Sequence, residues 1–143
     1  MEKNTLFLKA MLQQDWDLFE KLSAEFEQQG KGTPVAIIGT AFHLAVHQRF
    51  GHSRSMDDVI RFVADARAFL SEGRDLPTRE AEALICATLD MDFPDVEEII
   101  DSLDVGAMAE IEGQLLFKLV SDASPSEEQL DAFLVEAEVL ARQ

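Results

Sequence analysis

Cysteine is nearly absent from this sequence, since Cys86 is the only one among 143 residues. A single cysteine excludes an intrachain disulfide and a Cys-x-x-Cys metal knuckle. Its neighbours are apolar, namely Leu84, Ile85, Ala87 and Leu89. We therefore interpret Cys86 as a small core residue, because a nucleophilic cysteine would need a base that only distant histidines could supply.

Tyrosine is absent, glycine occurs only seven times, and β-branched runs that alternate apolar and polar residues are missing. Such features would mark a sandwich or a barrel. Apolar residues instead recur at helical spacing along most of the chain. Because 47% of the residues are hydrophobic, a core can form without disulfide or metal cross-links. We expect an all-α fold, a compact bundle of six or seven helices that forms a single domain over residues 1–143.

Long apolar runs and known catalytic motifs are missing as well. The apolar run at the N-terminus is broken by Lys9 and Asp15, unlike a signal peptide. The longest uncharged stretch, residues 32–48, is shorter than the roughly 20 residues of a membrane span. Residues 30–34 lack the spacing of a phosphate-binding loop, and residues 90–101 lack the glycine and glutamate of an EF-hand. These observations predict a cytoplasmic protein that is not an enzyme.

Positive charge is scarce in the second half of the chain. Residues 1–74 carry nine Lys and Arg against ten Asp and Glu, whereas residues 75–143 carry three against 18. The near-neutral and the strongly acidic half together give a net charge of −16. Nucleic acids and anionic membranes attract the opposite sign of charge, so we expect neither as a partner.

The segment from Pro34 to Phe50 predicts the central helix. It is apolar over most of its circumference, which is typical of a helix surrounded by others. Thr33 suits the N-cap, Pro34 the first helical position, and Gly51 the end.

Six further segments have helical periodicity. They lie at about 5–28, 56–71, 78–89, 94–103, 105–120 and from 124 to the C-terminus. Ser55 is expected to cap the helix that begins at Met56, and Asp95, Glu97 and Glu98 suit the start of the helix near Pro94. Ser124 with Glu127 resembles a capping box. Phe69 and Leu140 are expected to face the core.

All three histidines lie close together, at His43, His47 and His52. His43 and His47 are four residues apart, a spacing with which one helix face can hold a metal ion. No third ligand can be named, and Leu44 stands where a metalloprotease helix has its glutamate. The competing interpretation places His43 and His47 at a helix interface, hydrogen-bonded to backbone or carboxylates, with His52 on the surface.

Asp15 falls inside the apolar stripe of the first helical segment. A buried, unpaired carboxylate is costly and often marks a functional site. Two structural alternatives compete with a catalytic role. The helix breaks and Asp15 caps a second helix that starts at Trp16, or Asp15 pairs with a cation such as Arg49 or Arg67.

These features predict a non-enzymatic protein-interaction domain, of adaptor or regulatory type, with an acidic surface and no cofactor. The partner is a protein, basic in charge, or a second copy of the chain. Six of the ten Phe lie before residue 63, so a homodimer would form through the first three helices. The alternative is a metal- or small-ligand-binding domain that uses His43 and His47. A second alternative is an acidic inhibitor that mimics DNA.

Overall fold

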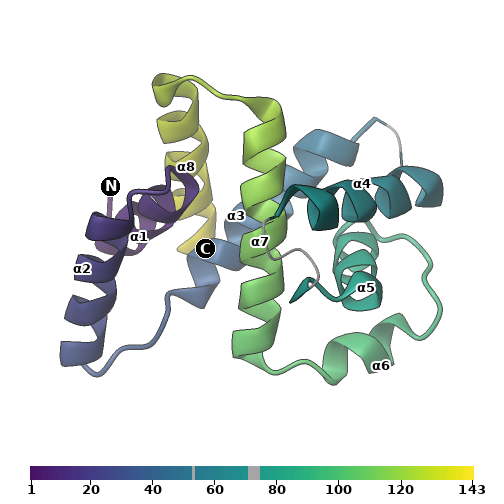
Figure 1. The fold of residues 1–143 in the computed structure, drawn as a ribbon, viewed down its shortest axis with the longest axis horizontal. Helices are drawn as coiled ribbons and strands as arrows, with labels where there is room; N and C mark the ends of the chain where they lie inside the picture. Colours follow the sequence, from purple (N-terminus) through teal and green to yellow (C-terminus); the bar gives the residue numbers. More distant parts are fainter. Residues whose placement is uncertain (53, 71–74) are drawn as a thin grey trace.

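The computed structural model describes residues 1–52, 54–70 and 75–143 and contains eight helices in these ranges (Figure 1). They are α1 (Lys3–Leu12), α2 (Trp16–Gln28), α3 (Val35–Phe50), α4 (Met56–Phe69), α5 (Thr78–Thr88), α6 (Val96–Asp101), α7 (Val105–Ala123) and α8 (Glu127–Ala141). The described residues form no strand, so the expected all-α fold is confirmed. None of their helices is both long and apolar enough to cross a membrane.

The count exceeds six or seven because the expected helix at 5–28 is split in two. Gln14 adopts a left-handed conformation with φ 58°, which ends the run of helical residues. Asp15 then caps α2, since its Oδ1 accepts a hydrogen bond from the backbone N–H of Leu18 at 3.3 Å. The interpretation of Asp15 as a cap is therefore confirmed, and its side chain is exposed.

Helix α3 lies at the centre of the fold, as predicted. It packs against α1, α5, α7 and α8, and most extensively against α7, which crosses in front of it in Figure 1. Its buried side chains are Ile37, Ile38, Ala41, Phe42, Ala45, Val46 and Phe50. The helix begins at Val35, one residue later than expected, and Gly51 ends it. The expected Thr33 cap is wrong, because Pro34 occupies the N-cap position without a side-chain hydrogen bond.

Two helix starts test the predicted caps. The hydroxyl of Ser55 accepts from the N–H of Asp58 at 3.1 Å, which confirms the cap of α4. The capping box of α8, however, pairs Ser126 with Gln129 rather than Ser124 with Glu127. The prediction placed it two residues early because α7 continues to Ala123, and Ser124 ends that helix in a left-handed conformation with φ 47°.

Several predicted core residues lie elsewhere. Phe69 and Leu140 remain 46% and 40% exposed, because the residues that follow them, Leu70 and Ala141, pack against the core in their place. The expected end of the helix at Ser71 lies outside the described residues. Of the six phenylalanines before residue 63, all but the partly buried Phe19 belong to the buried core. They therefore offer little free apolar surface for the expected homodimer.

A polar seam joins the two ends of the chain. Glu138 of α8 is buried, and its Oε2 accepts hydrogen bonds from the hydroxyl of Thr5 at 2.5 Å and the N–H of Glu2 at 2.8 Å. Its Oε1 accepts from Arg142 at 3.0 Å. These donors favour the charged form, led by the Thr5 hydroxyl, and hold the pKa of Glu138 below its usual value.

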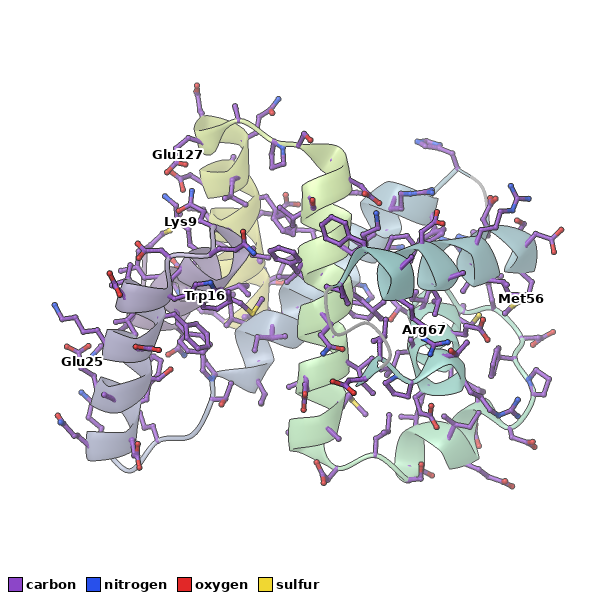
Figure 2. All side chains as sticks on the ribbon, viewed as in Figure 1. Lys9, Trp16, Glu25, Met56, Arg67 and Glu127 are labelled. Atoms are coloured by element: carbon purple, nitrogen blue, oxygen red, sulfur yellow. The ribbon has the colours of Figure 1, made fainter. Side chains whose placement is uncertain are left out.

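One turn further along α1, Lys9 extends the same seam (Figure 2). Its ammonium lies 2.8 Å from Glu127 and 2.7 Å from Asp131, both on α8. Gln13 donates to Glu127 at 2.6 Å. Helix α1 is thus fixed to α8 by directional contacts along its polar side.

Removal of the Thr5 hydroxyl tests this seam. Thr5→Val should lower the free energy of unfolding by about 1–3 kcal/mol, because the buried carboxylate loses a donor. Thr40→Val is the matched control, since the Thr40 hydroxyl only bonds the Ala36 carbonyl of its own helix and the substitution should cost less. Urea denaturation measures both, and equal losses would contradict a special role for Thr5.

The contacts of Glu138 in this seam predict that the stability of the fold depends on pH. Because the folded-state pKa of Glu138 is lowered, its charge stabilises the fold above the pKa of the unfolded chain, about 4.3, and this contribution is lost as pH falls towards the folded-state pKa. The wild type should therefore exceed Glu138→Gln in stability at neutral pH, and the difference should shrink below about pH 4. A pH-independent difference would argue against this assignment.

Candidate functional site

A cavity of about 860 Å³ opens between the α1–α2 hairpin and α7. In Figure 1 the α1–α2 hairpin and α7 lie on either side of the start of α3. Val35 and Ile38 of α3 line this cleft, while Phe69 and Leu70 at the end of α4 line another part of it. Apolar side chains supply most of its surface, which is typical of binding sites.

One wall of the cleft is a single face of α7. The lining residues recur every three or four positions, namely Gly106, Ala109, Glu110, Gly113, Gln114, Phe117 and Ser121. Three of them are glycine or alanine, so the helix backbone lies close to the cleft. A Cβ added at Gly113 would meet only the flexible end of Met11, at 3.9 Å.

The opposite wall is aromatic. Phe7 of α1 stacks on Phe19 of α2 at 4.6 Å between ring centroids, and Phe26 contacts Phe7 edge-on at 5.7 Å. Trp16 meets Phe19 edge-on at 5.4 Å and is 49% exposed. The cap at Asp15 explains this placement, because it starts α2 at Trp16 and directs Trp16, Phe19 and Ser23 to the cleft.

A second aromatic pair lies where α4 meets α7. Phe69 is 6.0 Å from Phe117 between centroids, and the ammonium of Lys118 lies 4.6 Å from the Phe69 ring. Lys118 also pairs with Asp122 at 2.6 Å. Phe69 is thus held in place although nearly half of it is exposed.

Acidic side chains lie on α7 and α2 near the cleft. Glu110 lines the cleft on α7 and is exposed. Asp17 and Glu20 of α2 are exposed and lie beside Trp16 and Phe19 in the sequence. The cleft therefore combines an apolar interior with one carboxylate in its lining and two exposed carboxylates on α2.

Helix α2 is attached to the fold through a single neighbour. Among the described helices only α1 packs against it. Phe7, Leu22 and Phe26 form a small apolar cluster of their own, apart from the main core around α3. The aromatic wall consequently rests on one helix, whereas the α7 wall is anchored in the main core.

The two helical histidines lie together on α3, with ring centroids 4.5 Å apart. Their predicted position at a helix interface is wrong for His43, which is exposed, whereas His52 is exposed as predicted. Neither His43 nor His47 hydrogen-bonds to another described residue, because the covered arc of α3 is its aliphatic one. Partial desolvation, followed by the neighbouring His47, lowers the pKa of His43.

A metal site at this pair would need further ligands. The described residues contain no group of three or more His, Cys, Asp or Glu side chains that could hold a metal ion. The metal-binding role of His43 and His47 therefore stays a prediction with two candidate ligands.

Cys86 and the acidic residues at the start of α6 make structural contacts outside the cleft. Cys86 is buried, its Sγ lies 3.7 Å from the sulfur of Met56, and burial raises the pKa of its thiol. Asp95 occupies the N-cap position of α6, and Glu97 and Glu98 lie in its first turn, so the three acidic residues stand at the start of the helix as predicted, although Asp95 makes no capping hydrogen bond. Asp95 also pairs with Arg79 at 3.4 Å.

Glu112 is the ionisable group that the sequence did not single out. It lies on α7 against α3, where a Cβ at Gly39 would stand 3.6 Å from its Oε1. It makes no hydrogen bond or ion pair with another described residue, and desolvation raises its pKa to about 7. Glu110 and Gln114, two residues before and after it, are polar as well. The apolar periodicity of the sequence therefore does not distinguish Glu112 from the exposed residues of α7.

A second cavity, of about 670 Å³, lies on another part of the surface. The end of α3, the end of α7 and the outer face of α8 line it, including Arg49, Phe133 and Glu136. Its charges are mixed, which distinguishes it from the acidic, aromatic cleft.

Compared with known proteins, the chain matches no protein-family model, no curated protein and no solved structure. The geometry of the cleft therefore has to carry the functional argument.

The partly buried position of Glu112 predicts that the stability of the fold falls with rising pH. Since the folded-state pKa is about 7 and the unfolded one about 4.3, ionisation between these values destabilises the fold. Glu112→Gln should be more stable than the wild type at pH 8 and equally stable below about pH 4. Glu110→Gln, an exposed control on the same helix, should show no such difference. Denaturant titrations at both pH values measure this, and a pH-independent gain for Glu112→Gln would contradict it.

Proposed function

We propose that this chain is a non-enzymatic protein-interaction domain, of adaptor or regulatory type, whose cleft binds an apolar segment of a protein partner. The observation that carries the proposal is the pair of half-exposed aromatics in the cleft, Trp16 and Phe69. Exposed aromatic surface beside a cavity is costly in water unless a partner covers it, and aromatic side chains dominate the binding energy of many interfaces.

The charge around the cleft supports a basic partner. Asp17, Glu20 and Glu110 lie on α2 and α7 near it, and the chain as a whole carries a net charge of −16. A basic segment would be steered to the cleft, and its positive charges would reduce the repulsion among the acidic side chains there. Nucleic acids and anionic membranes would be repelled. A cytoplasmic setting, in which Cys86 stays reduced, belongs to the same proposal.

Selection from a random peptide library tests the proposal. Peptides that bind the full chain should be rich in apolar and basic residues and should change the fluorescence of Trp16, the single tryptophan. Gln114→Arg, which adds bulk and positive charge inside the cleft, should weaken binding at least about tenfold. Added salt should weaken binding as well, since the acidic side chains near the cleft are exposed.

Gln48→Arg is the matched control, because Gln48 is exposed near the end of α3 and lines the second cavity rather than the cleft. Equal affinity of the selected peptides for wild type and Gln114→Arg would place their site elsewhere and contradict the proposal. The absence of any selected binder would contradict it too.

Metal binding is the second candidate, favoured by the close approach of the His43 and His47 rings. Our proposal predicts that the untagged protein, purified in the presence of Zn²⁺, retains much less than one metal ion per chain. Elemental analysis measures this, with His43→Ala/His47→Ala as the control. About one ion per chain, lost in the double variant, would favour the metal site over the interaction domain.

A further inference from the structure

The shape of the cleft limits the conformation that a bound segment can adopt. Its α7 wall extends from Gly106 to Ser121, which corresponds to about 22 Å of helix. The α2 wall is also a single helical face, formed by Trp16, Phe19 and Ser23. Figure 2 places Trp16 on the α1–α2 hairpin where it faces the α7 side. The site is therefore an elongated groove between two helices.

The small residues of α7 permit close approach to this wall. Gly106, Ala109 and Gly113 lie one turn apart, and a Cβ at Gly113 would meet only the end of the Met11 side chain. Packed helices lie 8–10 Å apart, and small residues at the contact allow the shorter of these distances. Such a wall accommodates another helix along its length.

Backbone hydrogen bonding argues against an extended segment. A buried strand needs a sheet edge to satisfy its N–H and C=O groups, and the described residues contain no strand. A helix satisfies its backbone groups internally and presents only side chains to the groove. Because α2 packs on α1 alone, the aromatic wall can adjust to the incoming side chains.

The acidic residues near the groove determine which charges the bound helix should carry beside its apolar stripe. Glu110 lines the groove on α7, and the exposed Glu20 follows Trp16 by one helical turn on α2, so carboxylates lie on or next to both walls. Lys and Arg beside the apolar stripe would complement both edges.

We infer that the occupant is an amphipathic helix of about four turns with basic edges, which lies along α7 and contacts Trp16 and Phe69. This inference rests on the proposed function and specifies the conformation of the partner segment.

Two synthetic peptides of about 18 residues test it. Both consist of Leu, Ala and Lys without Trp, with Leu at helical spacing, and in one of them two central residues are replaced by Pro, which breaks the helix. Titration of the full chain is followed by Trp16 fluorescence. The helical peptide should bind saturably, and the Pro peptide should bind at least about tenfold more weakly.

Charge reversals locate the contact. Glu20→Lys/Glu110→Lys should lower the affinity for the helical peptide at least about tenfold. The control, Glu97→Lys/Glu128→Lys, changes the total charge by the same amount at exposed positions outside the groove. It should leave the affinity within about threefold of the wild type. Equal effects of the two double variants would overturn the inference.

The remaining outcomes separate the two proposals. If both synthetic peptides bind equally through the groove, the helical conformation is refuted while the proposed function stands. If neither synthetic nor library-selected peptides bind, both fail. A dimeric chain in sedimentation analysis, with Trp16 shielded before any peptide is added, would make a second copy the occupant and would also overturn the inference.

Discussion

The contact between α3 and α7 is the interaction on which the rest of the structure depends. Helix α3 is apolar around most of its circumference, so it is stable in water only when other helices cover it. Helix α7 covers more of it than any other helix does. The carboxyl of Glu112 lies against α3 at Gly39, where an added Cβ would stand 3.6 Å from its Oε1. One face of α7 is committed to this contact, and the opposite face, from Gly106 to Phe117, becomes a wall of the cleft.

The two walls of the cleft differ in how they are held. Helix α7 belongs to the main core, whereas α2 packs only on α1. Helix α1 is in turn fixed to α8 by Thr5, Lys9 and their acidic partners. These directional contacts determine where the hairpin stands, while the small Phe7, Leu22 and Phe26 cluster determines where α2 lies on it. Because α7 is held in the main core while α2 can shift on α1, the cleft can accommodate side chains of variable shape.

Much of the fold could be predicted because its causes are local. The apolar circumference of α3 predicted a central helix, and Ser55 predicted the start of α4. The cap positions at Thr33 and Ser124 were wrong, because Pro34 itself occupies the N-cap of α3 and because α7 continues to Ala123, so that Ser124 ends one helix instead of starting the next.

The candidate site was much less predictable. The histidine pair was visible from its spacing, but the cleft depends on how α2 stands opposite α7, which no local pattern contains. Trp16 illustrates this difference. The Asp15 cap predicts that a helix starts at Trp16, whereas the half-exposed ring in a cleft follows only from the tertiary arrangement. Glu112 could not be predicted for the same reason, since its partial burial comes from a neighbouring helix, where it lies beside Gly39.

Amide chemical-shift mapping of the full chain with a library-selected peptide tests the central claim most directly. The account predicts that the largest shifts fall on α2 from Trp16 to Ser23 and on the cleft face of α7 from Gly106 to Ser121. Largest shifts around Arg49, Phe133 and Glu136 of the second cavity, or around His43 and His47, would contradict it.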